Sequence, residues 1–372
     1  MYSRGNHRIL DDMAFPDSFR EHVAVRVHEI LAQTEDEFGP MSPDVSEFLA
    51  PAFALTSGGK RMRALLMATG YRAAGSGSEI TDSVVELGAA LELFQAAALV
   101  HDDIIDDSDT RRSQPSTHVK FSALAPADAL ETPRVFGKNA AILLGDLLIV
   151  LADQAAARAF EGHEQRVQER CRRLWDEMTS EVAIGQYLDT LNSTLPLRSV
   201  SSDEALAAAL KVVRHKSARY SVEHPLTLGA ALGGGNDALI KCLKAVGLPL
   251  GEAFQLRDDD LGVFGNPEAT GKPAGDDLRE GKRTPLLAIT RQLADGDQRH
   301  LIEQHLGDRA MPGEIVEALR SIVIETGARS RHEALIDERL SLALDAIDKA
   351  GLPDAPAQEL MRHARNLAHR DA

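Results

Sequence analysis

The apolar residues of this chain recur at helical intervals along most of its length. From Phe19 onward they follow one another at spacings of about three to four residues, and clusters of glycine, proline and serine interrupt the pattern. No run of alternating apolar and polar residues is long enough to predict a β-strand. The predicted helices begin near Phe19 and near Lys60 and then cover residues 81–107, 140–160, 165–190, 203–232, 237–261, 285–305 and 313–350.

This pattern predicts an all-α fold, a single-domain helical bundle with a buried central group of helices. Residues 1–18 are interpreted as a loose N-terminal leader and residues 19–372 as the helical domain. A division into two domains is the alternative, but no linker is polar and long enough to favour it. The composition agrees with helices, because aromatic residues make up only 4% of the chain while alanine and leucine are abundant.

Charge and cysteine content narrow the class of protein. The net charge of −16 argues against a general nucleic-acid binder, which would carry a basic face. Cys171 and Cys242 have neither metal-ligand spacing nor partners for a disulfide framework, which fits a reducing cytoplasm. Met1 to Phe15 contains no apolar segment typical of a signal peptide, and no uncharged apolar run reaches membrane-spanning length. We therefore expect a soluble, cytoplasmic protein.

Two clusters of aspartates interrupt strongly apolar helical stretches, and each is followed by basic residues. They are Asp102, Asp103 and Asp106 with Arg111 and Arg112, and Asp258, Asp259 and Asp260 with Lys272 and Lys282. Crowded carboxylates repel one another, and a bound divalent cation relieves the repulsion. The basic residues suit the far side of a metal-bound phosphate or diphosphate. The pattern predicts metal ions that hold a polyanionic substrate.

Helix geometry supports this interpretation for the first cluster. Asp102 and Asp106 are four residues apart, so they lie on one face about 6 Å from each other, while Asp103 points about 100° away. Leu91 and Phe94 lie on the same side further up the helix, which suits a hydrocarbon tail below a charged head. A single acidic triplet is as often a solvated helix end, but the apolar helix and the second cluster favour a site.

These residues and several other motifs resemble the trans-isoprenyl diphosphate synthases, the head-to-tail prenyltransferases, from about residue 45 to the C-terminus. Each motif alone is weak, but they follow the order of the family. The other motifs are Gly58-Gly59-Lys60-Arg61-Met62-Arg63, Gly185-Gln186-Tyr187-Leu188-Asp189, His215-Lys216-Ser217, Phe254-Gln255-Leu256, Thr270-Gly271-Lys272 and Gly275-Asp276-Asp277. The resemblance implies the isoprenoid synthase fold with a central substrate cavity, and a homodimer.

The resemblance also implies roles for individual residues. The Mg²⁺ ligands on the allylic diphosphate are expected to be Asp102 and Asp106 for two ions and Asp258 and Asp276 for a third, with Asp103 and Asp259 close by. The diphosphate itself is expected to contact Arg111, Lys216, Lys272 and Lys282. Isopentenyl diphosphate is expected to contact Lys60, Arg63, Gln95 and Arg112. The residues expected at the reacting carbons are Lys216, Ser217, Tyr220 and Gln255.

The chemistry of such a reaction agrees with the residue types. Diphosphate leaves only when cations neutralise its charge, and its departure gives an allylic cation that the double bond of isopentenyl diphosphate attacks. The released diphosphate then takes the proton, so no nucleophile–base pair is needed.

Three positions depart from the family pattern. Gly262 stands where a third aspartate of the second cluster is usual, while Asp260 occupies a position that is often apolar. Ser113 follows the arginine pair where glycine is frequent. We expect activity to survive these changes.

The length of the product is expected to depend on the first acidic helix. Relatives that stop early have a bulky aromatic four or five residues before the first aspartate, where this chain has Ala98 and Ala97. Phe94, backed by Leu91, is the next candidate floor. One helical turn adds about 5.4 Å, comparable to one isoprene unit, which favours geranylgeranyl diphosphate. A longer chain and farnesyl diphosphate are the alternatives.

Other classes of protein share parts of this pattern. A class I terpene cyclase would lack a second diphosphate site, and Lys60, Arg63 and the low aromatic content argue against it. A non-catalytic partner subunit of a prenyl synthase usually loses its aspartates, which are intact in the first cluster. A helical scaffold with acidic faces explains neither the ordered motifs nor the basic residues.

Overall fold

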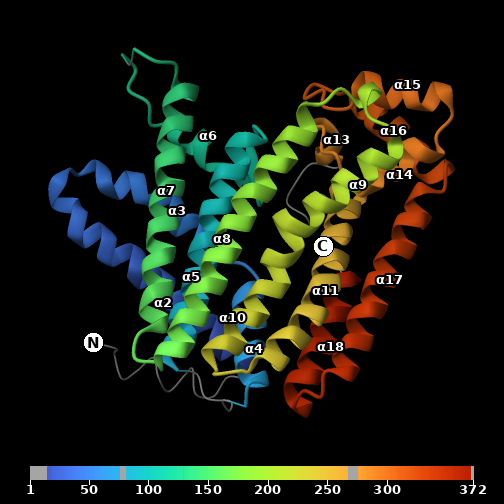
Figure 1. Ribbon diagram of the computed structural model, residues 1–372. Helices are drawn as coiled ribbons and strands as arrows, with labels where there is room; N and C mark the ends of the chain where they lie inside the picture. Colours follow the sequence, from blue (N-terminus) through green and yellow to red (C-terminus); the bar gives the residue numbers. More distant parts are fainter. Residues whose placement is uncertain (1–14, 76–80, 129, 267–274, 370–372) are drawn as a thin grey trace. The chain divides into compact units, whose positions relative to one another are not determined.

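The computed structural model describes residues 15–75, 81–128, 130–266 and 275–369 (Figure 1). Most of these residues are helical, and the strands among them are β1 (Thr110–Arg111) and β2 (Gln114–Pro115), which pair in a short hairpin. The all-α prediction is therefore confirmed. The described residues form two compact units, one within 1–109, 114–175 and 225–236 and the other within 110–113, 176–224 and 237–372.

The first unit is built around α5 (Asp82–Ile105), which carries the first aspartate cluster. The helix begins where the sequence predicts, because the Thr81 hydroxyl accepts a hydrogen bond from the backbone N–H of Val84. Its side chains are buried around most of its circumference, and it packs against neighbouring helices on several sides. The other elements of this unit are α2 (Phe15–Phe38), η1 (Gly39–Met41), α3 (Asp44–Thr56), α4 (Met62–Ala73), α6 (Thr117–Ser122), α7 (Pro133–Phe160), the start of α8 (Gln165–Thr194) and most of α10 (His224–Leu232).

The second unit is built around α11 (Asp237–Phe264), which carries the second aspartate cluster and packs closely against η3 (Val213–Glu223) and α17 (Ala328–Lys349). The other elements of this unit are the remainder of α8, η2 (Leu197–Ser199), α9 (Ser202–Val212), α13 (Asp276–Glu280), α14 (Pro285–Leu293), α15 (Gly296–His305), α16 (Gly313–Glu325) and α18 (Asp354–Ala368).

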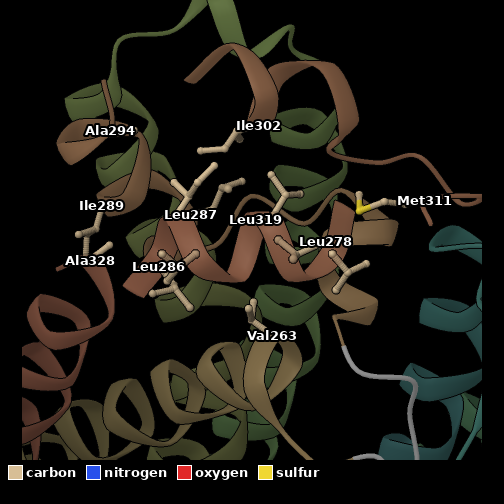
Figure 2. Packing of buried hydrophobic residues seen from close by; sticks show 13 residues of the cluster. Val263, Leu278, Leu286, Leu287, Ile289, Ala294, Ile302, Met311, Leu319 and Ala328 are labelled. Carbon is tan, nitrogen blue, oxygen red and sulfur yellow. The ribbon is translucent and has the colours of Figure 1, made fainter. Parts of the chain in front are cut away.

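A buried hydrophobic cluster packs α13 and α14 beside the end of α11 (Figure 2). Val263 comes from α11 and Leu278 from α13, and Leu286 and Leu319 join them from α14 and α16. Because these side chains exclude water together, the short helix α13 is held by tertiary packing and needs little stability of its own. The cluster therefore fixes the basic and acidic residues around α13 next to the second aspartate cluster.

The segment η3 differs from the prediction of one α-helix over residues 203–232. It is a π-helix of 11 residues, and the backbone N–H of His224 donates to the Arg219 carbonyl five residues earlier. Glycines on the flanking helices make room for it. A Cβ at Gly185 would lie 2.5 Å from the Lys216 backbone nitrogen, and one at Gly251 would lie 2.2 Å from the Ala218 carbonyl oxygen. The two helices can therefore approach η3 only where they lack a side chain.

Several helix boundaries were also predicted wrongly. The predicted helix 285–305 is divided at Asp295, whose side chain caps α15, and the predicted helix 313–350 is divided at Gly327, where φ is 74°. α7 begins at Pro133, seven residues before the predicted start, because proline is favoured in the first turn of a helix. α2 begins at Phe15, so the predicted boundary after residue 18 falls inside a helix; residues 1–14 of the leader lie outside the described residues. The division of the sequence into leader and domain otherwise stays a prediction.

Two of the described helices, α5 and α7, are long and apolar enough to cross a membrane by length and composition alone. The apolar window of α5 is 72% buried within the protein, as expected for a core helix of a globular protein. The window of α7 is 39% buried and leaves an apolar face exposed. Two such helices do not by themselves indicate a membrane protein.

Candidate active site

The first aspartate cluster lies at the C-terminal end of α5. The backbone N–H of Asp106 donates to the carbonyl of Asp102 at 2.8 Å, which closes one helical turn and places both half-buried side chains on the same side. Asp103 points into the protein and is only 2% exposed. The negative charge of Asp103 acts on the buried ring of His118, whose pKa is nevertheless lowered because burial outweighs it. Asp102 and Asp106 are therefore the members of this cluster that a solvated cation can reach.

Asp107 follows the cluster in a left-handed conformation, with φ of 54°. Its carboxylate accepts hydrogen bonds from Lys138 and Arg134 of α7, which lower its pKa to about 2. The 2.8 Å contact to the Lys138 ammonium already neutralises this carboxylate. Asp107 thus ties the end of the cluster to α7, and the sequence pattern gave it no role.

The hairpin after Asp107 carries the arginine pair. Arg112 and Ser113 at its tip have φ of 52° and 59°. Two successive positive φ values are typical of a two-residue hairpin turn, which explains why glycine is frequent at position 113 in relatives. Arg111 is half-buried and Arg112 exposed, so the two guanidinium groups have different surroundings.

The basic loop before α4 places its three cations differently. Lys60 is exposed and Arg63 is half-buried in the first turn of α4. Arg61, to which the sequence assigned no role, is buried with φ of 45°, and it donates to the Thr56 carbonyl at 2.9 Å and pairs with Glu92 at 3.4 Å. Arg61 therefore holds the loop, while Lys60 and Arg63 remain the candidates for a substrate. Gln95, the other candidate from this unit, is half-buried on α5.

Phe94 lies eight residues before Asp102, about two turns further into α5, and is buried. Its ring centroid lies 6.1 Å from that of Trp175 with an interplanar angle of 66°, an edge-on arrangement. The Trp175 indole N–H donates to the Asp153 carboxylate at 3.2 Å, which fixes the orientation of the indole. Ala97 is buried and Ala98 half-buried, as small residues between the aspartates and Phe94. Trp175 thus packs against Phe94, whereas the sequence had suggested only Leu91 as its backing residue.

In the second unit, Asp258 is half-buried on α11 and Asp259 is 6% exposed. The Gln255 side-chain amide donates to Asp259 Oδ1 at 3.0 Å, while Oδ2 has no hydrogen-bond partner among the described residues. Burial raises the pKa of Asp259 well above its usual value, and the charges of Asp277 and Asp258 raise it further, against the opposing effect of the Gln255 hydrogen bond. A buried carboxylate oxygen that lacks a hydrogen-bond donor suits a divalent cation, because such cations favour oxygen ligands.

Gly262 lies beside a carboxylate of α13. A Cβ at position 262 would lie 1.9 Å from Asp277 Oδ2, so the Asp277 side chain fills the space next to α11 where the third aspartate was expected. Lys282 pairs with Asp277 at 3.3 Å and with Glu280 at 2.9 Å. The sequence pattern selected Asp276, which is half-buried at the start of α13, and gave Asp277 no role. The sequence signal for Asp277 was the glycine at position 262, which leaves space for a side chain from another element.

Asp260 lies away from this group, although it is adjacent in sequence. It is buried and accepts two hydrogen bonds from the Arg329 guanidinium, at 2.9 and 3.0 Å, and Arg329 lies 4.0 Å from the centroid of the Phe264 ring. Arg257 donates to the Ala368 carbonyl at 2.7 Å and so anchors α18. Asp260 and Arg257 therefore serve the packing of α11 with α17 and α18, which separates Asp260 from the other aspartates of its cluster.

The π-helix η3 carries the remaining described candidates. The Lys216 ammonium pairs with the Asp189 carboxylate of α8 at 2.7 Å, both side chains being less than one-fifth exposed. Ser217 is half-buried and Tyr220 buried. Asp189 was part of a recognised motif but had no assigned role. Lys272 lies outside the described residues.

Comparisons with known proteins show the family of this chain. Residues 46–323 match the family model for polyprenyl synthetase. The chain is similar to the crystal structure of geranylgeranyl pyrophosphate synthase from Corynebacterium glutamicum complexed with isoprenyl diphosphate and magnesium, with 36% identity, a TM-score of 0.88 and coverage of 95% of this chain and 99% of that chain.

Two curated relatives show how far the named products of similar proteins vary. Geranylfarnesyl diphosphate synthase of Aeropyrum pernix is 32% identical over 310 residues, which cover 82% of this chain and 88% of the relative. Heptaprenyl diphosphate synthase component 2 of Geobacillus stearothermophilus is 30% identical over 345 residues, which cover 92% of this chain and 93% of the relative.

The neighbouring residues Asp259 and Asp260 are expected to affect stability in opposite directions. A carboxyl whose folded pKa is raised above its unfolded value loses folded-state stability as pH rises past the unfolded pKa, so Asp259→Asn should raise the Tm at pH 8 in EDTA. Asp260→Asn should lower the free energy of unfolding by about 2 kcal/mol, because hydrogen bonds from Arg329 lose their charged acceptor. Thermal unfolding followed by circular dichroism measures both; a shift of the same sign for the two variants would contradict the assignment.

Proposed function

The chain belongs to the polyprenyl synthetase family of trans-prenyltransferases, and we propose that it joins isopentenyl diphosphate head-to-tail to an allylic diphosphate in a Mg²⁺-dependent reaction. The observation that carries this proposal is the buried oxygen of Asp259 that has no hydrogen-bond partner among the described residues and lies beside Asp258, Asp277 and Lys282. A carboxylate in this position costs folding stability, and a cation-bound diphosphate offsets that cost.

We propose that aspartates of the two clusters hold the metal ions. Asp102 and Asp106 are proposed to hold two Mg²⁺ ions and Asp258 a third, with Asp276 or its neighbour Asp277 as its second carboxylate. Asp103 and Asp259 are buried beside these ligands and would add negative charge near the metal ions without binding them directly. Mg²⁺, when bound there, supplies the positive charge that makes diphosphate a leaving group. The position of Asp277 against Gly262 supports its inclusion.

Basic side chains would complete the two diphosphate sites. Lys216, held by Asp189, is proposed to contact the allylic diphosphate, and Lys282 is presented beside Asp277. Arg111 and Lys272 are retained as further contacts of that group. The proposed contacts of isopentenyl diphosphate are Lys60, Arg63, Gln95 and Arg112.

The reaction would then proceed by ionisation, condensation and elimination. The bond between the allylic carbon and the diphosphate oxygen breaks with both electrons on oxygen, the double bond of isopentenyl diphosphate forms the new carbon–carbon bond, and the released diphosphate takes the proton. The Gln255 amide nitrogen donates to Asp259, and its carbonyl oxygen, the negative end of the amide dipole, is proposed to stabilise the cation. Ser217 and Tyr220 are proposed to lie beside the reacting carbons.

We further propose geranylgeranyl diphosphate as the main product. The buried pair of Phe94 and Trp175 supports a firm end to the path of the hydrocarbon tail, and Ala97 and Ala98 leave the path open above it. The similar proteins carry names from geranylgeranyl to heptaprenyl synthases, so the depth of this floor decides among them.

The apolar face of α7 supports a homodimer. Its exposed apolar side chains recur in adjacent pairs seven residues apart, which is the spacing of helices that pack along their length. They are Val135 and Phe136, Ile142 and Leu143, and Ile149 and Val150. A second copy of the chain is the proposed occupant of this face.

We also propose a cytoplasmic location. Burial raises the pKa of the Cys171 thiol to about 12, so this side chain is an inert packing residue and needs no oxidising compartment. Cys242 is only partly buried and is likewise a free thiol.

The purified protein should form a twenty-carbon product from isopentenyl diphosphate and an allylic primer of five, ten or fifteen carbons in Mg²⁺, and should form none in EDTA. Chromatography of the dephosphorylated products measures their length. Asp258→Asn should reduce the rate by about 100-fold or more, because it removes a proposed metal ligand. An absence of condensation with every primer would overturn the proposed activity.

Phe94→Ala should shift the products toward longer chains, because it removes the proposed floor while retaining the aspartates. Val85→Ala is a matched control, since it also shortens a buried side chain of α5 but lies two to three turns from Phe94. An unchanged product distribution in Phe94→Ala would show that another element limits the chain.

The double variant Leu143→Glu with Val150→Glu should dissociate the dimer, since it places two charges in the proposed apolar interface. Ile324→Glu, at an exposed apolar residue of α16, is the control and should leave the dimer intact. Sedimentation velocity distinguishes the two states. A wild-type monomer, or a double variant that remains dimeric, would contradict an interface on α7.

A further inference from the structure

One carboxylate of α8 collects three donors from the segment that carries Lys216. Glu181 Oε1 lies 2.6 Å from His215 Nδ1 and 2.6 Å from Arg219 Nη1, and its Oε2 lies 2.8 Å from His224 Nε2. Burial opposes the ionisation of Glu181, but the hydrogen bonds with His224 and His215 and the charge of Arg219 outweigh it and lower the pKa of Glu181 to about 2. Glu181 is therefore ionised at neutral pH, and its three partners come from one continuous stretch of chain.

These three donors share a face only because η3 is a π-helix. An α-helix turns by about 100° per residue, so the nine residues from His215 to His224 would turn it by about 900° and place the two imidazoles on opposite sides. A π-helix, with hydrogen bonds to the fifth residue, turns less at each residue and returns to the same side after four to five residues. His215, Arg219 and His224 follow that interval, and the His224 N–H makes the corresponding π-helical hydrogen bond to Arg219.

The conformation of η3 also determines where Lys216 points. Lys216 is adjacent to His215, and its ammonium pairs with Asp189 of α8 at 2.7 Å. Gly185 lies between Glu181 and Asp189 on the same helix, one turn from each, and lets the backbone of η3 touch α8. A return of η3 to α-helical geometry would rotate Lys216 relative to α8 and separate it from Asp189.

A metal ion is an alternative occupant of this cluster, because the ligand atoms of Glu177, Glu181 and His224 lie within 4.8 Å of one another. The Arg219 guanidinium already supplies the cation there. It donates to Glu181 at 2.6 Å, to Glu177 at 2.8 Å and to Glu223 at 3.1 Å. Arg219 thus shares one positive charge among the three carboxylates, and Lys244 adds a second at 3.7 Å from Glu177, so protein cations already occupy the surroundings in which an ion would bind.

We propose that Glu181 is a positioning residue that keeps η3 in its π-helical form and thereby fixes Lys216 at the diphosphate site. It acts through His215, Arg219 and His224 and touches no substrate itself. This inference rests on the proposed function for its catalytic consequence, but its structural part, the orientation of Lys216, is independent of any activity.

The structural part is tested by lysine labelling of the substrate-free protein, with mass spectrometry of each site. In Glu181→Gln the acetylation rate of Lys216 should rise by about tenfold, because the charge that holds η3 is lost and the Lys216–Asp189 pair opens. Glu181→Asp should restore most of the protection. Lys349, near the end of α17, serves as an internal reference.

Glu177→Gln is the matched control, because Glu177 pairs with Arg219 and with Lys244 at 3.7 Å, while it acts on His224 through its charge. It should expose Lys244 to acetylation and leave Lys216 protected. His215→Gln removes a single donor at the edge of the cluster and should raise the Lys216 rate by a smaller factor. It provides a milder second variant if Glu181→Gln fails to fold.

The loss of Glu181 is expected to affect the binding of only one of the two substrates. Glu181→Gln should raise the KM for the allylic diphosphate by about tenfold and leave the KM for isopentenyl diphosphate unchanged, since Lys216 is proposed to contact only the former. Unchanged Lys216 labelling in both Glu181→Gln and His215→Gln would overturn the inference. If the wild-type protein has no prenyltransferase activity but the labelling of Lys216 increases in Glu181→Gln, the positioning of Lys216 is upheld and only the proposed function is overturned.

Discussion

The repulsion between carboxylates that are packed into apolar helices is the constraint on which the rest of this structure depends. Asp259 is buried next to the charges of Asp258 and Asp277, and one of its oxygens has no hydrogen-bond partner in the part of the chain that the structure describes. Such an arrangement opposes folding, so the neighbouring elements must be held by other interactions. The hydrophobic cluster around Leu278 and Leu286 supplies them, and it keeps α13 in place although the charges nearby repel one another (Figure 2).

The rotation of an α-helix divides each aspartate cluster into groups with different tasks. Successive residues point about 100° apart, so Asp103 turns inward while Asp102 stays at the surface of the first unit. The same rotation directs Asp260 to Arg329 and away from Asp258. Acidic residues that are adjacent in sequence thus serve both a candidate metal site and the packing of the helices that carry it.

The π-helix η3 places on one face residues that an α-helix would place on opposite faces. Its formation requires close approach by α8 and α11, which glycines such as Gly185 and Gly251 permit. The ionised carboxylate of Glu181 then holds three donors of the segment. Backbone geometry, small residues and one buried charge therefore together orient Lys216 toward Asp189.

The sequence by itself determined the all-α class, the order of the motifs and the existence of two acidic clusters, because helical periodicity and motif spacing are local properties. It placed the start of the first acidic helix at residue 81 and selected Phe94 as a candidate floor. Only the tertiary structure decided that Asp277 fills the space beside Gly262, that Asp260 pairs with Arg329, and that η3 is a π-helix. These features depend on contacts between residues that are distant in sequence, and no local pattern encodes such contacts.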